Sequence, residues 1–439
     1  MGAWNQLMQT VDQTEPISAQ GRVSKIVGLM VEAAGPRASV GEYCHIITRN
    51  GRELPAEVVG FRDSTTLLMP LGELEGIAPG DRVLPQSQKL TVPVGSGLLG
   101  RILDGLGHPL DGRPLLTETA YPLQNKPPNA LLRPRIRDTL SVGVRAIDGI
   151  LTIGRGQRMG IFAGSGVGKS ILLGMIARNT VADVNVIALV GERGRELRDF
   201  IEKDLGSEGL ARSVIIVVTS DQPALVRLKA AFTATAIAEY FRDRGENVLL
   251  MMDSVTRFAM AQREVGLTVG EPPATRGYPP SVFALLPKLL ERSGMAETGS
   301  ITGIYTVLVD GDDHNEPIAD SVRGILDGHI VLTRELAMQN NYPAIDILQS
   351  VSRVMNDVIS QEHQELAGIV REHISVYRDA KDLIDIGAYT SGSNPKIDAA
   401  IAHMDSILAF TRQGVDDHAG FEEMLKQLKG IIRPSSPQR

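Results

Sequence analysis

The chain of 439 residues has few cysteines and few aromatic residues, and these absences limit what it can be. Its single cysteine, Cys44, excludes an internal disulfide and fits a reducing compartment. We find no signal peptide and no apolar run long enough to span a bilayer, so we expect a cytoplasmic protein or one attached peripherally to a larger assembly. A net charge of −7 gives no general electrostatic case for a nucleic-acid partner.

Glycine is abundant, with 45 residues, and one glycine-rich stretch is especially informative. An apolar run at 159–162 leads into Ala-Gly-Ser-Gly-Val-Gly-Lys-Ser at 163–170, and an amphipathic helical run follows. Strand, glycine-rich loop and helix form the context of a phosphate-binding loop, where backbone N–H groups and the positive end of the helix hold an anion. Ala163 replaces the first glycine of the usual motif, but the other loop glycines keep the turn permissive. The stretch predicts a nucleoside triphosphate site.

Residue roles follow from the chemistry of such a loop. Lys169 is predicted to contact the terminal phosphates, and the Ser170 hydroxyl is predicted to ligate magnesium. The predicted nucleotide-binding residues of the loop are Gly164, Ser165, Gly166, Val167, Gly168, Lys169, Ser170 and Ile171.

Two acidic residues at the ends of apolar runs are candidates for the rest of the chemistry. Asp253 follows five apolar residues and is predicted to be the second magnesium ligand, although an aspartate in this place is often only a helix cap. Glu192 is the first ionisable residue after the apolar run 186–190 and is predicted to be the general base that activates water. Arg193 could stabilise the charge that develops on the γ-phosphate. Read in isolation, 192–196 would be a solvated charged turn.

The periodicity of apolar residues divides the chain into four segments. Trp4, Leu7, Met8 and Val11 share one helical face, which predicts a docking helix over 1–16 or a helix packed on its own domain. Short β runs over 17–93 predict a small all-β barrel. Over 94–350, a linker rich in glycine and proline precedes alternating strands and helices, which predicts a mostly parallel sheet covered by helices. Helical runs over 351–439 predict a C-terminal helical domain.

Four helices in these segments have predicted limits. A long helix is expected over 223–244, with Ser220 or Asp221 as its cap and Gly245 just past its end. After it, helices are expected over 354–377, 395–412 and 421–429.

Several of these stretches together resemble the catalytic subunits of rotary ATPases. They are 163–170, 191–196, 248–253, 342–346 and 350–354. The stretches 219–227, 270–283 and 309–320 resemble more closely the hexameric ATPases of flagellar and type III protein export. The resemblance covers nearly the whole chain. It implies an α/β fold with an N-terminal β-barrel, a central RecA-like P-loop ATPase domain and a C-terminal helical domain.

The resemblance also implies a homohexameric ring that binds ATP and Mg²⁺ between neighbouring subunits. Arg353 matches the arginine that enters the neighbouring subunit's site, where an arginine supplied in trans stabilises phosphoryl-transfer charge. Alternatively, Arg353 forms a structural salt bridge. Tyr342 matches the tyrosine that stacks on adenine, although an aromatic residue before a proline is otherwise usually a packing residue. Because Glu192 is present, the resemblance predicts hydrolysis rather than nucleotide binding alone.

The predicted function is ATP hydrolysis that energises protein export through the flagellar type III apparatus, at the cytoplasmic side of the inner membrane. The resemblance implies as partners a stator-like regulatory protein at the N-terminal segment, a central stalk protein, the export gate, chaperones and export substrates. The matching stretch at 389–397 lacks the acidic loop of the rotary β subunit, so we expect this ring to contact a central stalk differently. Alternatives are the ATPase of a virulence-type injectisome, a non-catalytic subunit of an ion-pumping rotary ATPase, and a ring-shaped RNA translocase, which the acidic charge disfavours.

Overall fold

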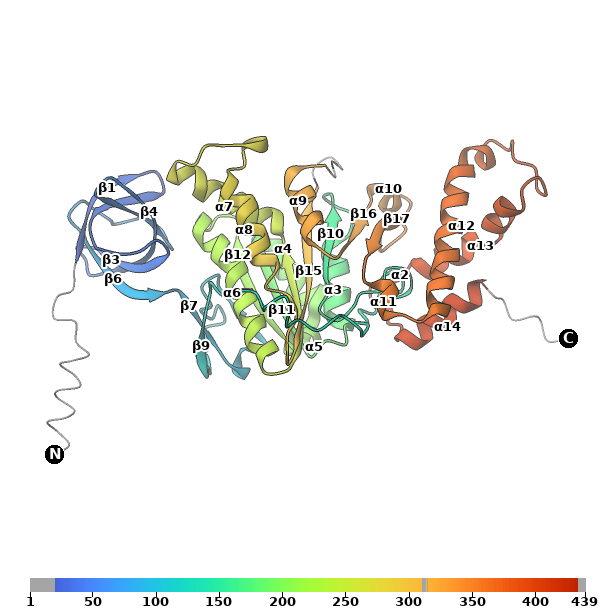
Figure 1. Ribbon diagram of the computed structural model, residues 1–439, viewed down its shortest axis with the longest axis horizontal. Coiled ribbons are helices and arrows are strands. Elements are labelled where there is room, and N and C mark those ends of the chain that lie inside the picture. The colour runs from blue at the N-terminus through green and yellow to red at the C-terminus, as the bar shows by residue number, and fades with distance from the viewer. Residues whose placement is uncertain (1–19, 310–312, 314, 433–439) are drawn as a thin grey trace, which may run out of the picture.

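A closed antiparallel β-barrel forms the first part of the structure, a computed structural model that describes residues 20–309, 313 and 315–432 (Figure 1). The docking helix predicted over 1–16 lies outside these residues. Apolar side chains alternate along the strands and fill the barrel interior, where burial raises the pKa of the Cys44 thiol to about 12. The strand order is β1 (Gly21–Val27), β2 (Met30–Ala34), β5 (Thr65–Pro70), β4 (Glu53–Arg62), β3 (Glu42–Ile47) and β6 (Arg82–Lys89).

The central part of the chain forms a nine-stranded sheet. Its central strands are long apolar runs buried on both faces, as a mostly parallel sheet between helices requires. The edge strand β17 and the short β14 are antiparallel to their neighbours. Along the sheet lie β17 (Ile345–Ser352), β16 (Gly328–Leu332), β10 (Arg158–Ala163), β15 (Ser300–Leu308), β13 (Asn247–Asp253), β11 (Val184–Glu192), β12 (Ser213–Thr219) and β8 (Arg101–Leu103), with β14 (Gly294–Met295) beside β15.

Helices cover both faces of this sheet, and two hydrophobic cores fill the spaces between the layers (Figure 1). The helices are α2 (Arg145–Ile150), α3 (Lys169–Asn179), α4 (Gly194–Asp199), α5 (Gly206–Ala211), α6 (Ala224–Asp243), α7 (Val255–Val269), α8 (Pro280–Leu290), α9 (Pro317–Ile325) and α10 (Arg334–Met338). Short 3₁₀ helices η1 (Ser96–Leu98) and η3 (Thr275–Gly277) and the π-helical turn η2 (Phe200–Leu205) complete this part of the chain.

The predicted cap of the long helix α6 was wrong. The residue before the first helical turn is Pro223, in an extended conformation, and no side chain caps the helix. Ser220 and Asp221 belong instead to a turn after β12, in which the N–H of Gln222 donates to the carbonyl of Thr219 at 3.2 Å. They therefore precede the helix by too many residues to reach its free N–H groups.

The linker before the ATPase sheet is attached by a buried ion pair. It forms the two-stranded ribbon of β7 (Thr91–Val94) and β9 (Thr119–Pro122) and then crosses the domain surface. The guanidinium of Arg292 donates to both carboxylate oxygens of Glu239, at 2.8 and 2.7 Å, and to the backbone carbonyl of Leu123 at 2.6 Å. Both ionic partners are fully buried, so their charges are compensated by each other, by these hydrogen bonds and by the Asn125 side-chain amide, which donates to Glu239 at 3.1 Å.

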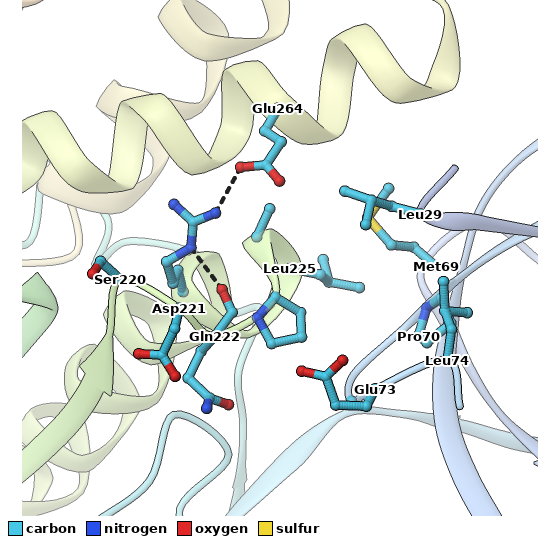
Figure 2. Close-up of a pocket in the computed structure, with 14 residues that line it drawn as sticks. Leu29, Met69, Pro70, Glu73, Leu74, Ser220, Asp221, Gln222, Leu225 and Glu264 are labelled. Carbon is cyan, nitrogen blue, oxygen red and sulfur yellow. Dashed lines mark hydrogen bonds and ion pairs between the residues drawn. The ribbon is translucent and has the colours of Figure 1, made fainter. Parts of the chain in front are cut away.

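The barrel and the ATPase domain also share an ion pair and a pocket. Lys229 on α6 is 4% exposed and pairs with Glu57 on β4. A pocket of about 310 Å³ lies beside this junction, with Leu29 and Met69 of the barrel facing Leu225 at the start of α6 (Figure 2). On the ATPase side of the pocket, Arg227 donates to Glu264 at 2.6 Å and to the carbonyl of Gln222 at 2.9 Å (Figure 2).

The C-terminal part of the chain is helical, as predicted, but its first helix is interrupted. The run expected over 354–377 forms two helices, and the Ser360 side chain caps the second by accepting a hydrogen bond from the N–H of His363 at 3.3 Å. The helices are α11 (Met355–Val358), α12 (Gln361–Asp385), α13 (Pro395–Thr411) and α14 (Phe421–Ile432). Among the described helices, none has the length and apolar composition needed to cross a membrane. The domain boundaries given above stay predictions.

Candidate functional site

The glycine-rich loop joins the carboxyl end of β10 to the start of α3, as the sequence predicted. Gly166 and Gly168 have φ angles of +80° and +89°, in the left-handed region where a glycine has no steric penalty. Ala163 is the last residue of β10 and pairs with both neighbouring strands in ordinary strand geometry. A side chain is therefore tolerated at the position where the usual motif has its first glycine.

The side chains predicted to carry the chemistry converge at the mouth of this loop. The Lys169 ammonium pairs with the Asp253 carboxylate, and its Nζ lies 3.8 Å from Oε1 of Glu192. The Thr306 hydroxyl donates to Oδ1 of Asp253 at 2.7 Å and so fixes its orientation. These groups come from the ends of three parallel strands and from α3, because the carboxyl ends of parallel strands meet at one edge of the sheet.

A bulge in the sheet directs Glu192 into this cluster. The register between β11 and β12 shifts at Gly191, which has a φ of +72°. A bulge inserts one residue and re-aims the next side chain. Burial and the nearby Asp253 charge raise the pKa of Glu192, whose side chain is only 13% exposed. Its Oε1 is buried and accepts no hydrogen bond from the described residues.

Arg257 belongs to this site, although the sequence analysis did not identify it. It lies in the first turn of α7, lines the same pocket as the loop, and has a buried Nε with no hydrogen-bond partner among the described residues. A side chain on Gly191 would place its Cβ 3.2 Å from the Cβ of Arg257, so Gly191 makes room for this arginine. The available signal was its spacing, four residues after Asp253 and one helical turn into α7.

These residues line an open pocket of about 630 Å³, which lies within the usual range for small-molecule sites. Tyr342 borders it and is 38% exposed, and carbon atoms of its ring lie 3.4 Å from where a Cβ on Gly168 would be. Val167 differs from the other loop residues, because its side chain is buried in the core and leaves only its backbone for a ligand. The pocket is lined by Ala163, Gly164, Ser165, Gly166, Gly168, Lys169, Ser170, Ile171, Glu192, Arg193, Glu196, Arg257, Leu308, Val309 and Tyr342.

Known proteins are similar to this chain in both sequence and structure. Residues 143–352 match the nucleotide-binding domain of the ATP synthase alpha/beta family, 23–86 match the β-barrel domain of that family, and 359–430 match the T3SS EscN ATPase C-terminal domain. A flagellum-specific ATP synthase of Bacillus subtilis (strain 168) is 56% identical over 429 residues, covering 97% of this chain and 98% of that protein. The chain belongs to the family of flagellar and type III secretion ATPases.

Two further relatives are ATPases of type III secretion systems. A type 3 secretion system ATPase of Xanthomonas euvesicatoria is 52% identical and covers 94% of this chain and 93% of its own length. The assembled ATPase EscN from the type III secretion system of enteropathogenic E. coli superposes with a TM-score of 0.90 at 48% identity, covering 94% of this chain and all of the EscN chain. The fold predicted from the sequence is thereby confirmed for the barrel, the ATPase domain and the helical C-terminal part.

The structure places Arg353 far from the pocket of its own ATPase domain. β17 is antiparallel to β16, so its start at Ile345 pairs with Leu332 and its end at Ser352 pairs with Gly328. Leu332 in turn pairs with Ala163 at the phosphate loop. Arg353 therefore lies at the opposite, amino edge of the sheet, where it is exposed.

Arg193 lies at the rim of the pocket rather than within the cluster. Its side chain is 78% exposed, and its closest ionic partner is Glu196 at 3.5 Å. To contact a bound phosphate, the Arg193 side chain would have to leave its weak surface ion pair with Glu196, which costs little free energy.

The chemistry of the pocket fits a magnesium nucleotide in three respects. Left-handed glycines provide a backbone cradle for phosphates. The buried Nε of Arg257 is a donor without a partner among the described residues, as an anion-binding group would be. Ser170 and Asp253 supply a hydroxyl and a carboxylate, which are the oxygen ligands that Mg²⁺ prefers.

Proposed function

We propose that this ATPase hydrolyses MgATP at subunit interfaces of a homohexameric ring and energises protein export through a flagellar type III apparatus. The observation that carries the proposal is the convergence of Lys169, Glu192 and Asp253 at the mouth of the phosphate loop, on a chain 56% identical to a flagellum-specific ATP synthase.

Each member of the cluster has a role in this proposal. Lys169 binds the β- and γ-phosphates, and Ser170 and Asp253 hold Mg²⁺, which when bound offsets the negative charge of the phosphates. Glu192 orients the attacking water and takes up its proton, a task for which a raised pKa suits a carboxylate at neutral pH. Arg257 and Arg193 stabilise charge that develops on the γ-phosphate, and Tyr342 stacks on adenine.

Arg353 completes the site of the neighbouring subunit in this proposal. Its position at the edge opposite its own pocket, exposed to solvent, supports action in trans. Arginines supplied in this way increase phosphoryl-transfer rates by about 10³–10⁵. Arg353→Ala should keep nucleotide binding and lose turnover in the assembled protein. Normal turnover of this variant would contradict the role in trans.

The partners and the location of the ATPase extend the proposal. A solved structure shows EscN in complex with its central stalk EscO, which supports a central stalk partner for this chain. A stator-like regulatory protein would bind the N-terminal segment, and chaperones, export substrates and the export gate would meet the ring at the cytoplasmic side of the inner membrane. The proposal includes no specific nucleic-acid partner.

A virulence-type injectisome is the second candidate system. The observation that favours it is the match of 359–430 to the EscN C-terminal domain, together with 52% identity to a Xanthomonas type 3 secretion system ATPase. Deletion of the gene distinguishes the two: loss of flagellar filaments supports the flagellar assignment, and normal filaments contradict it.

The enzymatic part is tested by measuring ATPase activity per subunit against protein concentration. A site shared between subunits predicts a cooperative rise, because turnover requires assembly. Lys169→Ala should abolish hydrolysis at every concentration. A constant activity per subunit would contradict the shared site, and near-normal activity of Lys169→Ala would contradict the assigned site.

A further inference from the structure

A groove beside Arg353 contains two arginines that the proposed mechanism does not use. It has a volume of about 480 Å³ and is lined by Arg135, Ile136, Arg137, Val354 and Asp357. Both arginines are exposed. For Arg135, Arg137 and Arg353, the structure shows no side-chain hydrogen bond or ion pair to any residue within its described ranges.

Packing holds the segment 135–137 in place while its two arginines stay free. The Ile136 side chain lies directly on the backbone of Gly154, where an added Cβ would come within 2.4 Å of it, and Val354 contacts the same glycine. Backbone hydrogen bonds of 2.8 Å join Leu140 to Ile153 and Arg155 to Asp138 on either side. Ile136 is therefore half-buried, whereas Arg135 and Arg137 on either side of it are exposed.

The Arg353 side of the groove is held by the same part of the chain. The Ser352 hydroxyl donates to the carbonyl of Thr152 at 2.8 Å, two residues from Gly154. The N–H of Arg353 donates to the carbonyl of Asp327 at 3.0 Å. All three arginines therefore lie on segments that are held against residues 152–154 at the amino edge of the sheet. We call them the arginine face.

The charge of this face is complementary to that of the nucleotide pocket of another copy only when the pocket contains a nucleotide. The charged residues at the pocket are three cations and three carboxylates, namely Lys169, Arg193, Arg257, Glu192, Glu196 and Asp253. These charges balance, and the triphosphate of a bound nucleotide makes the pocket anionic. The groove carries the opposite charge, since Asp357 is the only carboxylate among the described residues that line it, against two arginines and the adjacent Arg353.

We infer that Arg135 and Arg137 are positioning residues that dock the arginine face onto the nucleotide-loaded pocket of a second copy and thereby aim Arg353 at its phosphates. The inference rests on the proposed function, because it assumes that Arg353 acts in trans. Face and pocket lie at opposite edges of the same sheet, so the contact is head-to-tail, the type of interface that generates rings.

The test uses the full chain with both arginines reversed, Arg135→Glu with Arg137→Glu. Sedimentation with a non-hydrolysable ATP analogue measures assembly, and a fluorescent nucleotide measures binding by dilute subunits. We expect the protein concentration for half-assembly to rise about ten-fold or more, because like charges then meet across the interface. The affinity of dilute subunits for nucleotide should stay within about two-fold, since the face is remote from their own pocket.

Two matched variants separate this role from a general effect of charge or a loss of folding. Arg37→Glu reverses an exposed arginine at the barrel end of the molecule and should leave assembly unchanged (Figure 1). Replacing Arg135 and Arg137 by lysine keeps both positive charges, so assembly should stay close to that of the wild type. An assembly curve of the reversed variant that overlaps the wild type would overturn the inference, as would an equal shift in Arg37→Glu.

Mixed rings test whether the arginine face acts on a neighbour. The reversed variant has an intact pocket, and Lys169→Ala has an intact face, so mixing them pairs intact pockets with intact faces at about one quarter of the interfaces of a head-to-tail ring. At a concentration where each protein alone is inactive, the mixture should regain ATPase activity. No gain would overturn the inference, whereas a wild type without ATPase activity would overturn the proposed function while sedimentation still tests the face.

Discussion

Replacing Glu192 by glutamine tests the proposed base with the smallest change of shape. The carboxylate lies 3.8 Å from the Lys169 ammonium, is largely buried, and has one oxygen without a hydrogen-bond partner in the described chain. Glutamine keeps the size and one carbonyl oxygen but cannot accept a proton from water. Phosphate contacts of the loop do not involve this side chain, so nucleotide binding should persist.

The expected loss is in turnover. General base catalysis contributes about 10²–10⁴ to a rate, which corresponds to about 2.7–5.5 kcal/mol of activation free energy. We therefore expect kcat of Glu192→Gln to fall by about 10²–10⁴. Nucleotide affinity should change less than about three-fold, because the variant keeps the contacts that hold the nucleotide equally in the ground state and the transition state. Steady-state ATPase assays above the assembly concentration, with binding of a fluorescent nucleotide in parallel, measure both quantities.

The raised pKa of Glu192 adds a dependence on pH. Activity needs the ionised carboxylate, so kcat should rise with pH through a value above the ordinary glutamate pKa of 4.5. Ionisation is also harder in the folded state than in the unfolded state. Folding stability should therefore fall as pH rises from 4.5 through the raised folded pKa, and Glu192→Gln should lack this loss.

The variant should consequently be inactive yet more stable than the wild type. At pH 7 without nucleotide, we expect a gain of about 1–3 kcal/mol from removing an anion with an unsatisfied buried oxygen. Thermal unfolding measures it, and Glu202→Gln, at an exposed side chain of η2, serves as control. Substantial hydrolysis by Glu192→Gln, or a loss of stability, would refute the reasoning.

Three further predictions concern other parts of the structure. Arg257→Gln should lower kcat about 10²-fold or more, since a preorganised cationic donor is lost, while Arg257→Lys should lose less; equal kcat values for wild type and glutamine variant would contradict a role in the site. Glu57→Gln should destabilise the protein by about 3–5 kcal/mol, because Lys229 is left buried without a counter-charge; chemical denaturation measures this, and a change below about 1 kcal/mol would show that the pair contributes little. Tyr342→Ala should raise KM for ATP about ten-fold with little change in kcat, and Tyr342→Phe should behave as wild type if the ring stacks on adenine.

The cluster at the phosphate loop could be located from the sequence because its determinants are local. A buried apolar run that ends in a glycine-rich loop or in a carboxylate specifies both a parallel strand and the edge at which the next side chain lies. Lys169, Glu192 and Asp253 each follow such a run, and the structure brings them together. The same rule could not identify Arg257, because an arginine in the first turn of an amphipathic helix resembles any solvated residue.

Features that depend on tertiary packing were less predictable. The break between α11 and α12 depends on Ser360 capping a new helix, although the apolar period continues across it. The start of α6 depends on a turn after β12 rather than on the nearest residue that could cap. For Tyr342 and Arg353, only the resemblance to a family suggested a role, since a sequence does not reveal which side chains a second copy will meet.

The antiparallel edge strand β17 has a consequence for the ring as a whole. Tyr342 lies just before this strand at the pocket of its own subunit, and Arg353 follows its last residue at the opposite edge. Eight residues of extended chain span about 26 Å. On the proposed assignment, a single stiff strand connects the adenine of one active site with the phosphates of the next. Through this strand, nucleotide binding at one site could affect the neighbouring site without any movement of the barrel or of the C-terminal helices.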